Sequence, residues 1–101
     1  MKLYIDTSDR YKIKVGIGEK TFETDSKEGS SQKLLSFIDE KLKEENTSID
    51  KIKEIEVNTG PGSFTGLRVG VTVANTLGWV LKIPVNGKNL EKGETIEIKY
   101  E

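Results

Sequence analysis

The stretch Gly60–Gly66 (GPGSFTG) has the composition of a phosphate-binding turn. In such turns the backbone amides point at an anion, and the positive end of a following helix adds to the attraction. Gly60, Gly62, Ser63 and Gly66 are the residues that would form the site. Their spacing matches neither a P-loop nor a dinucleotide-binding fingerprint, and no lysine follows the last glycine. The alternative is that the turn only reverses the chain tightly and directs the helix behind it.

The sequence lacks the residue types on which most catalytic sites depend. It has no histidine, which removes the commonest general base and the commonest transition-metal ligand. It has no cysteine, which excludes disulfides and thiolate metal sites. Ser63 does not stand in a G-x-S-x-G motif, and no histidine can activate its hydroxyl. We therefore expect no catalytic residue, no metal site and no cofactor.

The elements on either side of the turn would position it. Glu54–Thr59 alternates apolar and polar residues and predicts a strand. Gly66–Leu81 is ambiguous, because its segment VGVTV alternates with period two and β-branched residues favour strands. The run is long for a strand, however; Ser63 or Thr65 can cap a helix start, and Pro84 lies just past the end. The sequence therefore predicts a helix over Gly66–Leu81.

This predicted helix carries a stripe of small residues at every fourth position: Gly66, Gly70, Ala74 and Gly78. Each glycine inside a helix costs about 1 kcal/mol relative to alanine, so a closely packed neighbour must offset the cost. One alternative is that the helix lies tightly on its own sheet. The other is a helix–helix contact with another subunit.

The rest of the chain predicts further strands and one more helix. Three strands joined by short turns indicate an antiparallel meander. A helix with Leu34, Ile38 and Leu42 four residues apart follows a polar loop. The expected elements are strands Lys2–Asp6, Tyr11–Ile17 and Thr21–Thr24, the helix Ser31–Glu45, and, after the second helix, strands Ile83–Val85 and Glu94–Tyr100.

The sequence from Gly60 to Gly87, GPGSFTGLRVGVTVANTLGWVLKIPVNG, closely resembles the signature of the TsaB (YeaZ) family. Members of this family are bacterial proteins required to make threonylcarbamoyladenosine in tRNA, beside the anticodon. The resemblance extends over residues 1–87 and is weaker before Glu54. It implies a single TsaB-like amino-terminal domain over residues 1–101, whereas typical members continue into a second domain of related fold.

The order β-β-β-α-β-α-β is that of a ribonuclease-H-like, or actin-like ATPase, half-domain of the α/β class. We expect a mixed sheet, formed by a three-stranded antiparallel meander plus parallel strands, with two main helices. Right-handed crossovers would place the loops after Asp6 and Thr59 at the carboxyl ends of neighbouring strands, where ligands collect in such sheets. In actin-like ATPases the equivalent site handles phosphate and metal, so the resemblance implies that Asp6 holds a cation and Ser8 a phosphate, with Thr7 in the same loop. Alternatively, these side chains only satisfy turn amides.

The resemblance also implies a role and partners. TsaB proteins resemble an inactive relative of the transferase TsaD, whose active site uses histidines that this sequence lacks. The implied function is a non-catalytic scaffold that pairs with TsaD through the two helices, with the ATPase TsaE docking onto the pair. Alternatives are a small nucleotide or phosphate binder with weak ATPase activity, and a homodimer. The expected interface residues are Leu34, Leu35, Ile38, Gly66, Gly70, Ala74, Leu77 and Gly78.

Charge and hydropathy set limits on other partners. Sixteen basic and 17 acidic residues give a net charge of −1, with no basic patch for a phosphate backbone. We therefore expect that this chain does not bind tRNA directly. No apolar run reaches transmembrane length, and the chain starts as a strand rather than as a signal peptide, which favours a cytoplasmic protein without a membrane partner.

Overall fold

The computed structural model describes residues 1–9, 11–25 and 31–89. The predicted strand Glu94–Tyr100 lies outside these residues. The described elements follow the predicted order, with boundaries that differ by one or two residues. They are β1 (Lys2–Asp6), β2 (Lys12–Ile17), β3 (Lys20–Asp25), α1 (Ser31–Glu44), the 3₁₀ helix η1 (Ile49–Lys51), β4 (Glu54–Val57) and α2 (Phe64–Leu81).

The four strands form one mixed sheet in the order β3-β2-β1-β4. The first three form the predicted antiparallel meander, with Ile5 opposite Val15 and Val15 opposite Phe22. β4 is parallel to β1, with Ile5 opposite Val57, so both strands end at the same edge of the sheet. This is the mixed sheet of the ribonuclease-H-like half-domain, and the prediction of the fold class is confirmed.

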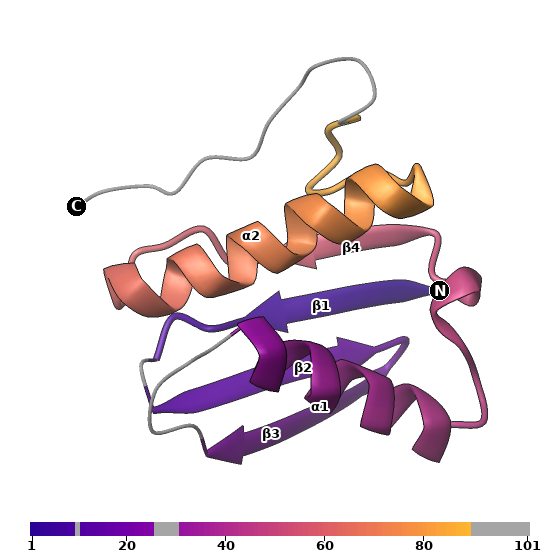
Figure 1. Cartoon of the computed structure of the whole chain (residues 1–101), viewed down its shortest axis with the longest axis horizontal. Coiled ribbons are helices and arrows are strands. Elements are labelled where there is room, and N and C mark those ends of the chain that lie inside the picture. Colours follow the sequence, from indigo (N-terminus) through magenta and orange to yellow (C-terminus); the bar gives the residue numbers. More distant parts are fainter. Residues whose placement is uncertain (10, 26–30, 90–101) are drawn as a thin grey trace.

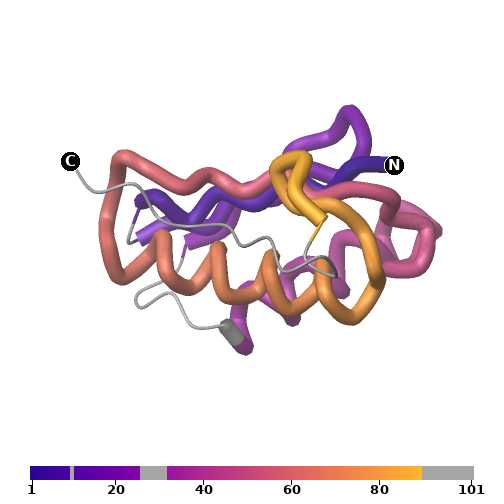
Figure 2. The backbone as a smooth tube through the Cα atoms, turned by 90° about the horizontal axis from the view of Figure 1, so that it is seen from above, coloured from indigo at the N-terminus to yellow at the C-terminus, as the bar shows by residue number. Residues whose placement is uncertain are grey.

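Both helices lie on the same face of the sheet. α2 runs over β1 and β4, and α1 runs over β2 and β3, beside α2 (Figure 1). The view from above shows the strands as one layer and the two helices as the other (Figure 2). The period of two along each strand sends every second side chain to this face, where the core forms. The core side chains are Leu3, Ile5, Ile13, Val15, Ile17, Leu34, Phe37, Ile38, Leu42, Ile52, Ile55, Val57, Val71, Val73, Ala74 and Val85.

The segment that resembled a strand by its period, VGVTV, is part of helix α2, as predicted. Ser63 caps the start of the helix, because its hydroxyl oxygen accepts a hydrogen bond from the Gly66 N–H at 3.3 Å. The helix ends at Leu81, and the residue after it, Lys82, adopts a left-handed conformation with φ of 58°. Local capping and the tertiary contacts of the small residues outweigh the β-propensity of the valines.

Two of the predicted strands differ in the structure: one is absent and one is shorter. Ile83–Val85 is not a strand, since only Val85 forms a parallel bridge, with Ile55. Pro84 has no N–H to donate, and the chain turns back immediately after Val85. β4 ends at Val57 instead of Thr59, because the side chain of Asn58 accepts a hydrogen bond from the Gly60 N–H and begins the turn there. The 3₁₀ turn η1 was not predicted.

Candidate functional site

The loops after β1 and β4 meet at the carboxyl edge of the sheet, as predicted. The Asn58 N–H donates to the Ile5 carbonyl at 2.9 Å, which continues the pairing of the two strands. The Asn58 side-chain amide then donates to Asp6 Oδ1 at 3.2 Å. The structure therefore brings Asp6–Ser8 and the glycine turn together.

Both carboxylate oxygens of Asp6 accept hydrogen bonds from donors of its own chain. Its Oδ1 accepts hydrogen bonds from the Ser8 N–H at 2.9 Å, the Ser8 hydroxyl at 2.6 Å and Asn58. Its Oδ2 accepts a bond from the Tyr4 hydroxyl at 3.3 Å. Burial alone would raise the pKa of Asp6, but these hydrogen bonds outweigh it and hold the pKa below its ordinary value. This is the geometry of a carboxylate that stabilises a turn.

The glycine turn packs directly on the loop after β1. The Ser63 N–H donates to the Ser8 carbonyl at 2.7 Å. A β-carbon at Gly62 would lie 2.6 Å from the β-carbon of Ser8, closer than real β-carbons approach other atoms. Gly60 has a φ of 123°, which only glycine adopts readily, and its peptide bond with Pro61 is cis. The amide of Ser63, which a phosphate-binding turn would offer to an anion, is thus used by the protein backbone.

Thr7 connects this edge of the sheet to helix α2. Its side chain is buried, and its hydroxyl donates to the Gly66 carbonyl at 2.5 Å and accepts from the Gly70 N–H at 3.1 Å. These two backbone groups are four residues apart, so they are the donor and acceptor of one intrahelical hydrogen bond in a regular α-helix. β-carbons at Gly66 and Gly70 would overlap the Thr7 carbonyl oxygen and hydroxyl, respectively. The two glycines therefore allow the helix to lie on β1.

A cavity of about 220 Å³ adjoins the predicted phosphate site on the side of the meander. Three acidic side chains and two lysines line it, and one of the lysines, Lys12, forms an ion pair of 3.3 Å with Glu23. The lining contains no residue of the glycine turn. Its residues are Asp6, Ser8, Asp9, Lys12, Lys14 and Glu23. An excess of carboxylates does not favour an anion.

Most of the predicted interface residues are buried within this chain. Leu34 and Ile38 belong to the core, and all four small residues of the stripe on α2 are buried. For Gly66 and Gly70 the contacts are those of a helix on its own sheet, the first of the two alternatives above. Leu35 is 44% exposed and Leu77 is half-buried. These two leucines are therefore the members of the predicted set that can contact a partner.

Leu35 and Leu77 line an apolar groove between the two helices, with a volume of about 200 Å³. The groove was not predicted as such, because it depends on how α1, α2 and η1 meet. Val80, one turn beyond Leu77 on α2, is 65% exposed and extends the apolar surface. The helical spacing of Leu77 and Val80 was the available signal for this extension. The groove residues are Leu35, Ile38, Asp39, Leu42, Ile49 and Leu77.

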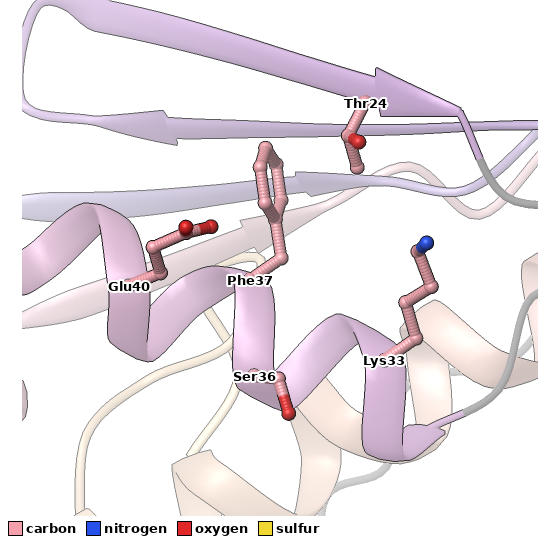
Figure 3. Close-up of a pocket in the computed structure, with 5 residues that line it drawn as sticks. All are labelled: Thr24, Lys33, Ser36, Phe37 and Glu40. Atoms are coloured by element: carbon pink, nitrogen blue, oxygen red, sulfur yellow. The ribbon is translucent and has the colours of Figure 1, made fainter.

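A larger cavity of about 550 Å³ lies between β3 and the outer side of α1 (Figure 3). Phe37 points from the helix toward the sheet, and Lys33 and Glu40 flank it on the same helix (Figure 3). The ammonium of Lys41 lies 5.4 Å and 5.3 Å from the ring centres of Phe22 and Phe37, which shields these rings from water. Thr24 and Ser36 complete the lining. The polar groups do not converge on one point, so we assign no ligand to this cavity.

Residues 1–9, 11–25 and 31–89 contain neither a cluster of metal ligands nor a helix that could span a membrane. No group of three acidic side chains in this part of the chain is placed to hold a metal ion. No helix found there is long and apolar enough to cross a membrane.

The sequence and the fold were then compared with known proteins. The family model described as "TsaD: tRNA N6-adenosine threonylcarbamoyltransferase" matches residues 24–89. The tRNA threonylcarbamoyladenosine biosynthesis protein TsaB of Bacillus subtilis is 37% identical over 60 residues, which are 59% of this chain and 26% of that protein. TsaB of Escherichia coli is 33% identical over 57 residues, 56% of this chain and 25% of that protein. The tRNA N6-adenosine threonylcarbamoyltransferase of Mycoplasmoides gallisepticum is 43% identical over 56 residues, 55% of this chain and 18% of that protein.

A solved structure, YeaZ from Pseudomonas aeruginosa, has a similar fold, with a TM-score of 0.67 and 25% sequence identity. The match covers 83% of this chain and 41% of that chain. In the sequence comparison, the residues matched in the TsaB proteins of Bacillus subtilis and Escherichia coli are about a quarter of the length of those proteins.

Proposed function

The chain belongs to the TsaB (YeaZ) family, which takes part in the biosynthesis of threonylcarbamoyladenosine in tRNA, and from this premise we propose that it is a non-catalytic scaffold subunit of the modifying complex. A scaffold needs a stable surface for a partner and no reactive groups. The following observations support that role.

The observation that carries the proposal is the apolar groove between α1 and α2. Leu35, Leu77 and Val80 expose apolar surface on two adjacent helices. Apolar surface of this kind, with a polar rim that here includes Asp39, is typical of a protein–protein interface. Burying it is favourable by about 25 cal/mol for each Å² of apolar area removed from water.

We propose a TsaD-type transferase as the partner. The chain is similar in sequence to both TsaB and TsaD proteins, so the two types have related domains. A partner with the same pair of helices could pack them against α1 and α2 as a four-helix bundle. A TsaE-like ATPase would then bind the pair, and the cytoplasm would be the compartment in which the complex meets tRNA. A homodimer through the same groove is the competing assembly.

The geometry at the carboxyl edge argues against the nucleotide-binding alternative. Both carboxylate oxygens of Asp6 accept hydrogen bonds from its own chain, and the amide of Ser63 is bonded to Ser8. A nucleotide would have to separate these loops and replace their hydrogen bonds. The near-zero net charge likewise favours a transferase, rather than this chain, as the subunit that holds tRNA.

The proposal is tested by co-expression with the TsaD-type protein from the same genome, followed by size-exclusion chromatography with light scattering. We expect a one-to-one complex. A homodimer that excludes the transferase would contradict the scaffold proposal, and so would separate elution of the two proteins. Titration with ATP, followed by calorimetry, would identify the nucleotide-binding alternative by saturable heat.

A pair of neighbouring substitutions on α1 tests the surface. Leu35→Glu places a carboxylate in the groove, and we expect the affinity for the transferase to fall by about a hundredfold, as at interface hot spots. Ser36→Glu adds the same charge on the adjacent residue, which lines the cavity between β3 and α1 and not the groove (Figure 3). It should leave the affinity unchanged. Equal effects of the two variants would exclude this groove as the interface.

A further inference from the structure

The segment after α2 ends in a two-residue hairpin that lies against the outer edge of β4. Val85 and Lys88 pair through two backbone hydrogen bonds of 2.9 Å, one in each direction. Asn86 and Gly87 between them have φ values of 50° and 79°. Positive values at both central residues are typical of the tight hairpin turns that favour Asn-Gly. The local sequence thus accounts for the turn.

The side chain of Asn86 occupies the position of a strand residue beside β4. Its Oδ1 accepts a hydrogen bond from the Val57 N–H at 2.8 Å, and its Nδ2 donates to the Val57 carbonyl at 3.0 Å. Two backbone bonds extend the same edge, from the Ile55 N–H to the Pro84 carbonyl at 2.9 Å and from the Asn86 N–H to the Ile55 carbonyl at 2.8 Å. The outward-facing groups of Ile55 and Val57 are therefore satisfied by residues 84–86. Because unpaired strand edges attract other chains, this closure protects the sheet.

The residue that closes the edge is also chemically labile. Asn86-Gly87 is the one Asn-Gly pair in the sequence, since the other asparagines precede threonine or leucine. Without a side chain on the following residue, the backbone nitrogen of Gly87 can approach the side-chain carbonyl carbon of Asn86 freely. A β-carbon at Gly87 would have no other atom within 4 Å, so the surrounding structure does not shield the turn.

We propose that Asn86-Gly87 is a deamidation site that the closed edge of β4 holds in check. After loss of its proton to hydroxide, the backbone nitrogen of Gly87 attacks Cγ of Asn86. The N–Cγ bond forms, the Cγ–Nδ2 bond breaks, and Nδ2 leaves as ammonia with a proton from water. The resulting succinimide is opened by water to aspartate or isoaspartate, so the net reaction consumes one water and releases one ammonia.

The folded edge opposes this reaction because both polar atoms of the Asn86 side chain are held by Val57. Cγ cannot turn toward the Gly87 nitrogen unless both bonds break. The reaction therefore requires local opening of residues 84–88 from β4. After the reaction, aspartate would place a carboxylate oxygen where Nδ2 faced the Val57 carbonyl, which replaces a hydrogen bond by repulsion. Isoaspartate would also add a carbon to the turn, so a modified molecule would not close its edge again.

The test is mass spectrometry of the full chain after incubation at mildly alkaline pH, in buffer and in urea. Trypsin releases Ile83–Lys88, which reports on Asn86, and Val69–Lys82, which reports on Asn75 as an internal control. In urea we expect the first peptide to gain the mass of an amide-to-acid exchange much faster than the second. In buffer its rate should be lower by about tenfold or more, since opening is rare. Equal rates for Asn86 in buffer and in urea would overturn the proposal.

Two variants test separately the attack of the Gly87 nitrogen and the closure of the β4 edge by Asn86. Gly87→Ala in urea should slow deamidation of Asn86, because a β-carbon hinders the attacking nitrogen; an unchanged rate would exclude this mechanism. Asn86→Asp reproduces one product, and we expect its urea midpoint to lie below that of the original chain. An unchanged midpoint would show that the Asn86 side chain does not close the edge.

Discussion

Helix α2 has two sides that are used in opposite ways. On the side toward β1, Gly66 and Gly70 bring the helix backbone onto Thr7, and a single hydroxyl connects their polar groups. On the side toward α1, Leu77 lines a groove with Leu35, and apolar surface there is left uncovered. Small residues thus mark the contact that the chain makes with itself. Larger apolar residues mark the surface that we propose for a partner.

The largest effect on stability is expected from a methyl group placed at the junction of α2 with β1, where Gly66 contacts Thr7. Gly66→Ala would overlap the Thr7 carbonyl oxygen, and we expect the free energy of unfolding to fall by about 3 kcal/mol. Urea unfolding followed by circular dichroism measures the change. Since alanine favours a helix over glycine by about 1 kcal/mol, a variant as stable as the original chain would show that the junction is loose. Thr72→Ala, exposed on the same helix, is the control and should change little.

Removing the connecting hydroxyl should have the next largest effect. Thr7→Val removes both hydrogen bonds of the buried hydroxyl, and we expect a loss of about 2 kcal/mol. Thr7→Ser keeps the hydroxyl and should lose about 1 kcal/mol, from the missing methyl group. Urea midpoints of the two variants give the comparison. If serine were no better than valine at this position, the hydrogen bonds would not hold the helix.

A substitution in the groove should have the opposite effect, because binding of the transferase is lost while the fold is retained. Because Leu35 is already 44% exposed, Leu35→Glu should lower the free energy of unfolding by about 1 kcal/mol or less. The same variant is expected to lose the transferase. A thermal unfolding curve measured beside the binding experiment checks both. A large loss of stability would mean that Leu35 belongs to the core and not to a docking surface.

The smallest expected effect concerns the pH dependence of stability. The hydrogen bonds from Ser8, Asn58 and Tyr4 lower the pKa of Asp6 from its ordinary value of 3.8. Its contribution to stability is therefore fully present above that value and is lost as the pH falls through the lower pKa of the folded state. Below pH 3.8 we expect the original chain to lose more stability on acidification than Asp6→Asn does. Parallel curves for the two proteins would mean that the turn does not depend on this carboxylate.

The sequence predicted the order of the elements and the class of the fold. Alternation along Lys2–Asp6 and Glu54–Val57, turn residues between strands and a cap at Ser63 are local signals, and local signals specify local structure. The predicted strand Ile83–Val85 was wrong, because Pro84 has no N–H to donate and the chain turns back after Val85, so only Val85 bridges to β4. That the Asn86 side chain pairs with β4 could not be predicted, since it is a contact between segments far apart in the chain.

The candidate site shows the same division. The sequence identified Asp6–Ser8 and Gly60–Gly66 as stretches that would meet, and the parallel pairing of β1 with β4 brings them together. It could not decide between a phosphate site and a pair of loops bonded to each other. That depends on whether the Ser63 amide points at open space or at the Ser8 carbonyl.

The sequence by itself determined the two α-helices and the four strands β1 to β4, and it excluded chemistry that depends on histidine or cysteine, because these follow from residue type and spacing. Only the tertiary structure decided that the glycines of α2 face Thr7 and that Leu35 and Leu77 form a groove. The helical period places a residue on a face of its helix, but what that face meets is set by packing against segments distant in the chain.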